Sequence, residues 1–539
     1  MTSYLSRRTL LRAAGGAFAA TVAGTSGGIA GLSLLHGRAQ AAVTDPALLS
    51  ALEAASLLQA GQLHPRELLD ACLRRSSEFD GPINSWVRTY PELAYQQADE
   101  AAQRLAGGNA PLLCGVPIAL KDLFSVQGLP VTASSRVLAG NIASGTATAW
   151  QRLRDQGAVL LGHTHTDEFA FGTVTPQVGN PWDTTAIAGG SSGGSAAALA
   201  ARFVPLALGT DTGGSLRIPA SRTGVSAIKP TFGRVSRYGV IPNDLSRDHV
   251  GAMGRSLADA ALVLSAMAGP DLADPATSVA GPMAGYPASV SGRAKPLTGK
   301  IFGVDRDTTN RLPAALGILM SNFLDLITHL GGQLRDIAMP RLPAYTADVL
   351  GPGQYHRQFA GRLPLYQPAT AATVGLCIAG ASAPIKDYVA ITVERARFAH
   401  DYNRLFADRA LDAVIVPAAV TDRQPRATAL LAQLATDTPM TWANYAGAPV
   451  IALPAGRSAE TGLPFGVQLG GIPWSDNDLI TIGLELQAAE PLWKDEPALR
   501  PGPRELPHTG PATPGPGSDP TNTVVAPAPV PFAPTTATH

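Results

Sequence analysis

The sequence predicts an α/β fold built on a buried, mixed β-sheet. From Leu113 onward, short apolar runs alternate with segments of helical periodicity. Runs that are apolar along their whole length are typical of strands covered on both faces. The chain has 539 residues, 45% of them hydrophobic and 15% charged, which is enough apolar material for one large core. The expected strands are residues 116–120, 158–161, 204–208, 225–228, 301–304, 413–416, 450–453 and 465–469.

A helical layer is expected before the first of these strands. Asp45 followed by Pro46 is an N-cap with proline at the first helical position, and Pro65 opens a second helix. A third helix is expected over residues 91–105. The segment 45–107 therefore predicts helices that pack on the sheet.

Two clear helical patterns lie between residues 256 and 330. One covers residues 256–268 and has Ser256 as its N-cap, and the other covers residues 312–330. Between them, residues 269–300 are rich in Pro, Ala, Gly and Ser and predict an irregular excursion. Residues 351–384 show no clear period, and we assign no element there.

The strongest functional signal is the glycine- and serine-rich stretch at residues 189–220. Two Ser/Gly clusters, at 189–195 and 212–215, bracket a short Ala-rich helical pattern and an apolar run. Glycine lets the backbone turn sharply and lets successive N–H groups point into one concavity, where a developing oxyanion can be held. The clusters present Ser191 and Ser215.

A lysine lies upstream of the two clusters, within an apolar run. Lys121 stands in GVPIALKDLF. A serine nucleophile needs a base, and loss of hydration lowers the pKa of a lysine toward neutrality. By itself, a lysine beside apolar residues more often extends to solvent, and a lone Ser/Gly cluster is more often a turn. Two clusters at this spacing, together with Lys121, favour a catalytic set.

These residues resemble the amidase signature family. Its mark is a Gly/Ser-rich segment followed by a GxDTGGSxRxPA block, with a lysine upstream, and the block here reads GTDTGGSLRIPA. Similar motifs are TDEFAFG, NPWD, IKPTFGRVSRYGVIP and LPFGVQLGG. The likeness extends from about residue 45 to about residue 495, which is far more specific than a lone glycine motif.

The resemblance implies amide hydrolysis by a Ser–Ser–Lys triad. Lys121 would be the base, Ser191 the bridging serine and Ser215 the acylating nucleophile, and one of the two serines would follow a cis peptide bond. The oxyanion hole would consist of the backbone N–H groups of Thr212, Gly213, Gly214 and Ser215. The resemblance also implies a large mixed sheet covered on both faces by helices, a small-molecule amide as partner, and no metal or organic cofactor.

Several residues near the triad carry further expectations. Asp211 and Arg217 flank Ser215, and we expect an ion pair that braces the loop rather than a contact with substrate. His165 stands where the family commonly has asparagine, so the hydrogen bonds of that position are left open. Supporting hydroxyl groups are expected from Ser192, Ser195 and Thr210.

Two other hydrolase classes share parts of this pattern. Residues 189–193 fit the G-x-S-x-G nucleophile elbow of α/β-hydrolases, with Ser191 as nucleophile. That motif requires a strand directly before it, whereas residues 180–185 are turn-rich, and the HGGG-type segment that forms the oxyanion hole in such enzymes is missing. A metal-dependent amidohydrolase would use His163 and His165, because His-x-His at a strand end is a common ligand pair. The remaining histidines of the central region lie in expected loops or helices, which disfavours that class. A non-enzymatic scaffold would require loss of the triad, and all three members are present.

The resemblance also covers the glutamine-hydrolysing subunits of tRNA-dependent amidotransferases, which are cytosolic and work in complexes. An export signal argues against that branch, as does Ile218, where such subunits commonly carry glutamine. We therefore expect a self-contained amide hydrolase, with a homodimer left open. Aliphatic, aryl and C-terminal peptide amides, and esters, all remain open as substrates.

The first 41 residues predict a twin-arginine signal peptide. Arg7 and Arg8 stand in SRRTLL, a mildly apolar run follows at 13–35, and AQA supplies a cleavage site, so the mature chain would begin near Ala42. The twin-arginine machinery would then be a partner, and the enzyme would be periplasmic or secreted. The alternative is an uncleaved anchor, but the glycines in the run make it a weak spanning helix.

Composition sets the remaining expectations. The formal net charge is zero and no basic stripe stands out, which argues against a nucleic-acid partner. Three widely spaced cysteines form neither a disulfide framework nor a metal pattern. Residues 42–495 are the expected amidase domain. Residues 496–539 contain twelve prolines and predict a disordered tail.

Overall fold

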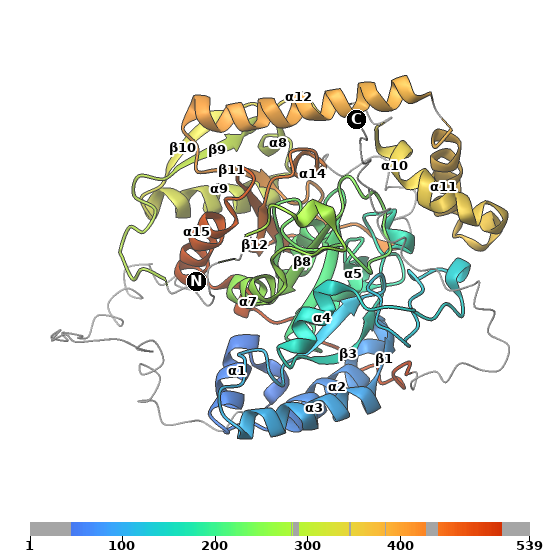
Figure 1. The fold of residues 1–539 in the computed structure, drawn as a ribbon. Helices are drawn as coiled ribbons and strands as arrows, with labels where there is room; N and C mark the ends of the chain where they lie inside the picture. Colours follow the sequence, from blue (N-terminus) through green and yellow to red (C-terminus); the bar gives the residue numbers. More distant parts are fainter. Residues whose placement is uncertain are drawn as a thin grey trace, which may run out of the picture. The chain divides into compact units, whose positions relative to one another are not determined.

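The computed structural model describes residues 45–281, 283, 290–343, 347–382, 384–426 and 440–508, and Figure 1 shows its ribbon. The expected signal peptide lies outside the described residues, as does the part of the expected tail after His508.

The described residues form one main sheet of eleven strands in the order β1-β3-β2-β6-β8-β7-β12-β13-β11-β9-β10. β2 is parallel with β3 and β6, and β9 is parallel with β10 and β11. The other neighbours are antiparallel, so the sheet is mixed as expected. The strands are β1 (Trp86–Thr89), β2 (Pro117–Lys121), β3 (Val159–Thr164), β6 (Leu206–Asp211), β7 (Ser226–Lys229), β8 (His249–Gly254), β9 (Ile301–Asp305), β10 (Gln333–Ile337), β11 (Ala413–Pro417), β12 (Val450–Arg457) and β13 (Pro464–Gly470).

All eight expected strands are present, and the central ones are buried along their whole length. Every residue of β2, β3, β6, β7, β8 and β11 is buried. A strand can be buried in this way only when both faces of the sheet are covered, here by helices. The predicted fold class is therefore confirmed.

Sequence reasoning missed three strands of the main sheet, which are β1, β8 and β10. β1 and β10 are the two edge strands. β1 has only 4 residues and β10 is mostly exposed, so neither carries a long apolar run. β8 is central, but its sequence HVGAMG contains two glycines and a histidine, which weaken the strand signal.

The expected N-terminal helices are present as α1 (Ala51–Gln59), α2 (Pro65–Ile83) and α3 (Pro91–Ala106). The prolines open α2 and α3 as predicted. Asp45 does cap a helix, but only the three-residue 3-10 turn Pro46–Leu48. α1 begins separately, with Ser50 and Glu53 forming a capping box.

The remaining helices lie between the strands and after them. They are α4 (Thr148–Asp155), α5 (Gly193–Ala200), α6 (Arg217–Thr223), α7 (Leu257–Met267), α8 (Arg306–Thr309), α9 (Ala314–His329), α14 (Trp442–Tyr445) and α15 (Asp476–Ala489). Ser256 caps α7 as expected. A separate two-stranded sheet pairs β4 (Gly179–Asn180) with β5 (Asp183–Ile187).

The region that the sequence left unassigned is helical. It contains α10 (Ala347–His356), a 3-10 segment (Arg357–Leu365), α11 (Pro368–Gly380) and α12 (Ile385–Arg409). Aromatic contacts join this region to the TDEFAFG loop, because Phe169 packs against Tyr355, His356, Phe359 and Tyr366. Among the described helices, none alone has the length and apolarity to cross a membrane, and only α11 with α12, bent by 109°, meet that criterion together.

The predicted boundary of the tail at residue 496 is corrected by the structure. Residues 502–508 lie against α2 and β1, with backbone hydrogen bonds from Gly81 N to Gly502 O and from Thr89 N to Pro507 O. Arg504 forms an ion pair with Asp80, whose carboxyl is completely buried. Backbone pairing and one buried charge hold a segment whose composition by itself cannot form a core.

Candidate active site

The candidate base lies at the carboxyl end of β2, between two parallel neighbours. Carboxyl ends of parallel strands meet at one edge of a sheet, where α/β proteins place their ligands. Lys121 is the last residue of β2, and its Nζ donates to Thr210 Oγ1 near the end of β6 at 2.8 Å. The same Nζ donates to Ser191 Oγ at 2.7 Å. The structure thus brings two of the three expected triad residues into direct contact.

Burial controls the protonation of Lys121. The side chain is completely buried, and loss of hydration lowers its pKa to about 7, although the carboxylates of Asp211, Asp167 and Asp248 act to raise it. A large fraction of the amine is therefore neutral at physiological pH, and a neutral amine can accept a proton.

Ser191 is held by its main chain against residues 167–175. The Gly190–Ser191 peptide bond is cis, so Ser191 is the serine that follows the cis bond implied by the resemblance. The Ser191 carbonyl accepts hydrogen bonds from Asp167 N and from Thr175 Oγ1, both at 3.1 Å. A Cβ on Gly190 would lie 2.7 Å from Val174 N, so this close backbone approach requires glycine.

The second Ser/Gly cluster forms the turn between β6 and α6. Asp211, the last residue of β6, folds its carboxylate back over this turn. Its Oδ1 accepts from Gly214 N at 2.8 Å, and its Oδ2 accepts from Leu216 N at 3.1 Å. Ser215 lies between these two anchored residues, so its backbone is fixed on both sides.

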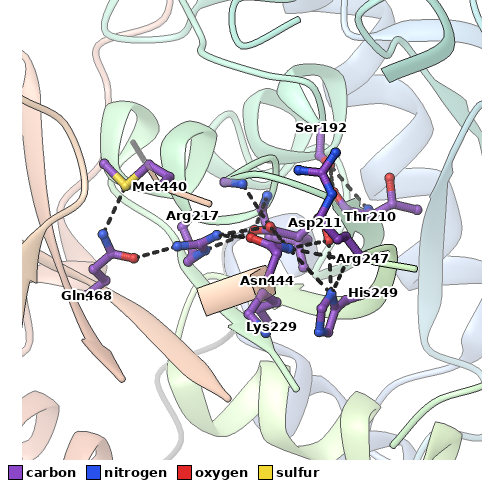
Figure 2. A network of polar contacts seen from close by, with 12 residues as sticks. Ser192, Thr210, Asp211, Arg217, Lys229, Arg247, His249, Met440, Asn444 and Gln468 are labelled. Carbon is purple, nitrogen blue, oxygen red and sulfur yellow. Dashed lines mark hydrogen bonds and ion pairs between the residues drawn. The ribbon is translucent and has the colours of Figure 1, made fainter. Parts of the chain in front are cut away.

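The expected ion pair between Asp211 and Arg217 is present and completely buried (Figure 2). Arg217 Nε donates to Oδ2 and Nη2 donates to Oδ1, both at 3.0 Å. Burial acts to raise the pKa of Asp211, but Arg217, together with Lys229 and Asn444, holds that pKa far below its usual range. The carboxylate that anchors the turn therefore stays ionised.

One backbone hydrogen bond joins the two serine clusters, from Ser192 N to Ser215 O at 3.1 Å. The exposure of the two candidate serines differs, since Ser215 is 6% exposed and Ser191 is 0% exposed. A nucleophile must meet its substrate, and this difference favours Ser215 for that role.

The expected oxyanion hole is partly open. In the described part of the chain, the backbone N–H groups of Thr212, Gly213 and Ser215 have no hydrogen-bond partner. The N–H group of Gly214 is committed to Asp211 instead. Three donors on a turn between a strand and a helix are suited to hold an anion.

Ser191 lacks the surroundings of a nucleophile elbow. The strand before it, β5, belongs to the small two-stranded sheet and not to the main sheet. Its hydroxyl contacts a lysine, whereas an elbow serine pairs with histidine. The elbow interpretation is therefore not supported.

The predicted alternative of a metal site at His163 and His165 is also not supported. The ring of His163 is completely buried, with Nδ1 2.6 Å from Tyr90 Oη and Nε2 2.9 Å from the Phe124 carbonyl oxygen. Both nitrogens already have protein partners, and neither is left for a metal. Burial also lowers the pKa of His163 and of His165 to about 4, so both rings are neutral.

His165 replaces the commonly found asparagine and makes backbone connections of its own. Its N–H donates to Ser85 O at 2.8 Å, and its carbonyl accepts from Gly194 N in the first turn of α5 at 3.1 Å. Its Nδ1 lies 3.2 Å from Ser134 Oγ. The residue thus ties the start of α5, and with it the Ser191 loop, to the neighbouring loops.

Two residues that sequence reasoning missed complete the network around Asp211, as Figure 2 shows. Asn444 on α14 and Gln468 on β13 both accept hydrogen bonds from Arg217, at 2.9 and 2.8 Å. LPFGVQLGG contains Gln468, but nothing in that motif indicates which residue it touches. Asn444 lies in no motif that we used.

Comparison with known proteins agrees with this geometry. The family model described as Amidase matches residues 67–353 and 376–480. A curated relative, a glutamyl-tRNA(Gln) amidotransferase subunit from Dinoroseobacter shibae, is 34% identical over 483 residues, which cover 80% of this chain and 95% of that protein.

Solved structures give the same result. The native peptide amidase from Stenotrophomonas maltophilia is 27% identical, with a TM-score of 0.71, over 84% of this chain and 98% of that one. 6-Aminohexanoate cyclic dimer hydrolase superposes with a TM-score of 0.74 over 84% of this chain and 99% of that one, and at 24% identity it supports the fold alone. The chain therefore belongs to the amidase family, whose enzymes hydrolyse carbon–nitrogen bonds in amides.

Proposed function

We propose that this amidase is a self-contained, exported enzyme that hydrolyses a small carboxamide through an acyl-Ser215 intermediate. The observation that carries the proposal is the buried contact between Lys121 Nζ and Ser191 Oγ, 2.7 Å long, beside the turn that presents Ser215. A base with a pKa of about 7 is matched to work near neutral pH.

Proton transfer would run from Ser215 through Ser191 to Lys121. The neutral amine has two N–H donors and one lone pair, so it can keep donating to Thr210 Oγ1 while it accepts the Ser191 proton. Ser191 in turn takes the proton of Ser215, and Ser215 Oγ attacks the amide carbonyl carbon.

The negative charge that develops on the carbonyl oxygen would be met by the N–H groups of Thr212, Gly213 and Ser215. Such a donor contributes about 3 kcal/mol to stabilising the transition state. As the carbon–nitrogen bond breaks, the leaving amine receives its proton back through Ser191. Water then hydrolyses the acyl-enzyme by the same proton route, and both serine hydroxyls are restored.

The name of the curated relatives suggests a second function, that of an amidotransferase subunit. Two features of this chain favour the self-contained enzyme. The twin-arginine segment is typical of an exported protein. Ile218 replaces the glutamine expected in such subunits. Its Cδ1 lies 2.8 Å from the position that a Cβ on Gly214 would take, so an apolar side chain packs on the Ser215 turn.

Two measurements on the purified protein, with no partner added, test the proposal. A panel of aliphatic, aryl and peptide amides, with glutamine included, is assayed for release of ammonia or amine. An alkyl fluorophosphonate is then used to label the nucleophile, and the label is located by peptide mapping. We expect turnover of at least one simple amide and a label on Ser215.

Substitution separates the alternatives. Ser215→Ala should abolish both turnover and labelling, because it removes the attacking oxygen and little volume. The matched control is Ser221→Ala, which alters a buried serine on α6, the helix that follows the Ser215 turn, and should retain activity. A label on Ser191, or turnover that survives Ser215→Ala, would overturn the residue assignment. Ammonia release from glutamine alone would favour the amidotransferase function.

A further inference from the structure

We propose that Asn444 is a positioning residue that sets the geometry of the Ser215 turn by acting through Asp211. The inference rests on the proposed role of Ser215. Asn444 is 2% exposed and lies 233 residues after Asp211 in the chain. α14, which carries it, is a single short turn of helix.

The amide of Asn444 contacts both members of the buried ion pair. Its Nδ2 donates to the Asp211 main-chain carbonyl at 2.9 Å and to Asp211 Oδ1 at 3.0 Å. Its Oδ1 accepts from Arg217 Nη2 at 2.9 Å. Figure 2 shows the side chain lying between the two charged groups. One side chain therefore fixes both the backbone and the carboxylate of Asp211.

The position of the Asp211 carboxylate controls the turn. Oδ1 receives three hydrogen bonds, from Gly214 N, Arg217 Nη2 and Asn444 Nδ2. A rotation of the carboxylate would move its contact with Gly214, which lies directly before Ser215. The turn contains two adjacent glycines, and Gly214 has a φ of 126°, so its own backbone preferences leave it free to move. Contacts from outside the turn must supply its rigidity.

An amide is the group that this position requires. It must donate toward a carboxylate and a carbonyl on one side and accept from a guanidinium on the other, and asparagine has both functions. A carboxylate there would repel Asp211 and could donate nothing. An apolar side chain would leave buried polar groups of Asp211 and Arg217 with fewer partners.

Gln468 holds the other side of Arg217 and so limits where the guanidinium can go. Its Oε1 accepts from Arg217 Nη1 at 2.8 Å, while its own Nε2 donates to Pro417 O at 3.1 Å. Every nitrogen of the Arg217 guanidinium therefore has a buried partner. With Arg217 fixed in this way, Asn444 is, among the described residues, the side chain that donates to both the main-chain carbonyl and the carboxylate of Asp211.

Asn444→Asp tests the inference, because the introduced carboxyl can donate only when it is protonated. The measurement is the second-order rate of Ser215 labelling by an alkyl fluorophosphonate, expressed as the ratio of variant to wild type at each pH. We expect a ratio of about 1:100 at pH 8, the loss typical of a misplaced catalytic group. The ratio should rise as pH falls, because protonation restores the hydrogen bond to Asp211. Titration of Lys121 occurs in both proteins and cancels in the ratio.

The charged and titratable groups that face Asn444 allow this interpretation. They are Asp211, Arg217, Arg247 and His249, with Lys229 acting on Asp211 from β7. Burial holds the pKa of His249 well below its usual range, so its ring stays neutral in the tested range. Burial lowers the pKa of Lys229 to about 7, so Lys229 titrates in wild type and variant alike and, like Lys121, cancels in the ratio. A carboxyl placed beside the ionised Asp211 has a raised pKa and titrates in the variant alone.

The matched control is Asn141→Asp, at a buried asparagine whose Nδ2 donates to the Val131 carbonyl at 3.0 Å. Its ratio should stay near one at every pH.

A wild-type rate of Ser215 labelling in Asn444→Asp at pH 8 would overturn the inference. A lowered ratio that stays constant or decreases as pH is lowered would also overturn it. If that variant does not fold, Asn444→Ala carries the test, and a folded Asn444→Ala protein that labels at the wild-type rate would overturn it. A wild-type protein not labelled at Ser215 would overturn the proposed function instead.

Discussion

At the scale of single residues, the pKa of Lys121, the proposed base, is set by a balance between burial and nearby carboxylates. Asp211, Asp167 and Asp248 each favour the charged form of Lys121, and burial outweighs them. Asp211 is the carboxylate that raises the pKa of Lys121 most, and its ion pair with Arg217 supports the Ser215 turn.

The pH dependence of the reaction should report Lys121. Its pKa is lowered to about 7, so kcat/KM for a hydrolysed amide should rise as pH increases through about 7 and the amine loses its proton. Lys121→Ala should lose at least 100-fold in rate, the usual contribution of a general base being about 10²–10⁴. Lys121→Arg should not rescue it, because a guanidinium stays charged.

A matched lysine replacement makes the result specific. Lys300→Arg, at a partly exposed lysine directly before β9, should leave both the rate and its pH dependence unchanged. If Lys121→Arg retained activity with an unaltered acid limb, Lys121 would be a structural cation, and a different base would act on Ser191.

The sequence predicts the residues proposed to react better than it predicts the residues that position them. Lys121, Ser191 and Ser215 lie in recognisable motifs, and the structure places the first two 2.7 Å apart. The role of Asn444 was not predictable, because its only link to Asp211 is spatial and the two lie 233 residues apart. Gly214 was expected to face an anion, but no sequence pattern indicates that its N–H group is taken by Asp211.

At the scale of elements, the segment at residues 502–508 fastens the N-terminal helical layer. Arg504 donates to the buried Asp80 and also to Asn84 Oδ1 and the Trp86 carbonyl. The other oxygen of Asp80 accepts from Ser85 N at 2.7 Å and Ser85 Oγ at 2.6 Å. The Ser85 carbonyl accepts from His165 N, and the His165 carbonyl accepts from Gly194 N. A continuous series of hydrogen bonds therefore links the segment 502–508 to the start of α5, next to Ser191.

Arg504→Gln should lower the unfolding temperature, and the loss should grow with pH. Burial raises the pKa of Asp80 to about 6 even though Arg504 lowers it, so the carboxyl needs a cation only when it is ionised, above that pH. The free energy of unfolding should fall by about 1–3 kcal/mol at pH 8, less than the roughly 3–5 kcal/mol of a fully buried pair because Arg504 is partly exposed. At pH 5 the difference should be much smaller.

Thermal unfolding followed by circular dichroism at both pH values measures this difference. Arg500→Gln, at an exposed arginine just before this segment, is the matched control and should change nothing. An equal loss at pH 5 and pH 8 would contradict the proposed dependence on ionised Asp80.

Among the elements, buried strands with a continuous apolar run were predictable, whereas the buried strand β8, with its glycines and histidine, and the exposed helices were not. A strand covered on both faces is usually apolar along most of its length, and such a run is visible in the sequence. α12 has few buried residues, and its first half is mostly exposed, so no apolar periodicity indicates it. The tail boundary failed for a related reason, because backbone pairing and one charge leave little trace in composition.

At the scale of the whole molecule, the proposal of export can be tested without knowledge of the substrate. Replacing Arg7 and Arg8 together by lysine should keep the protein in the cytoplasm, because the arginine pair is the part of a twin-arginine signal that its receptor reads. Arg12→Lys, outside the pair, should be exported normally. Cell fractionation gives the location, and mass spectrometry of the exported form should find an N-terminus near Ala42. Export of the double variant at the normal level would contradict the twin-arginine route.

The network around Asp211 also has a consequence for synthesis on the ribosome. Arg217 needs Asn444, 227 residues later, and Gln468, 251 residues later. A nascent chain that has emerged as far as α6 already carries Lys121, Ser191 and Ser215, but none of the late contacts that brace their surroundings. Incomplete chains released before Gln468 should therefore be catalytically silent, and hydrolytic competence should arise in one late step, when almost the entire polypeptide has been made.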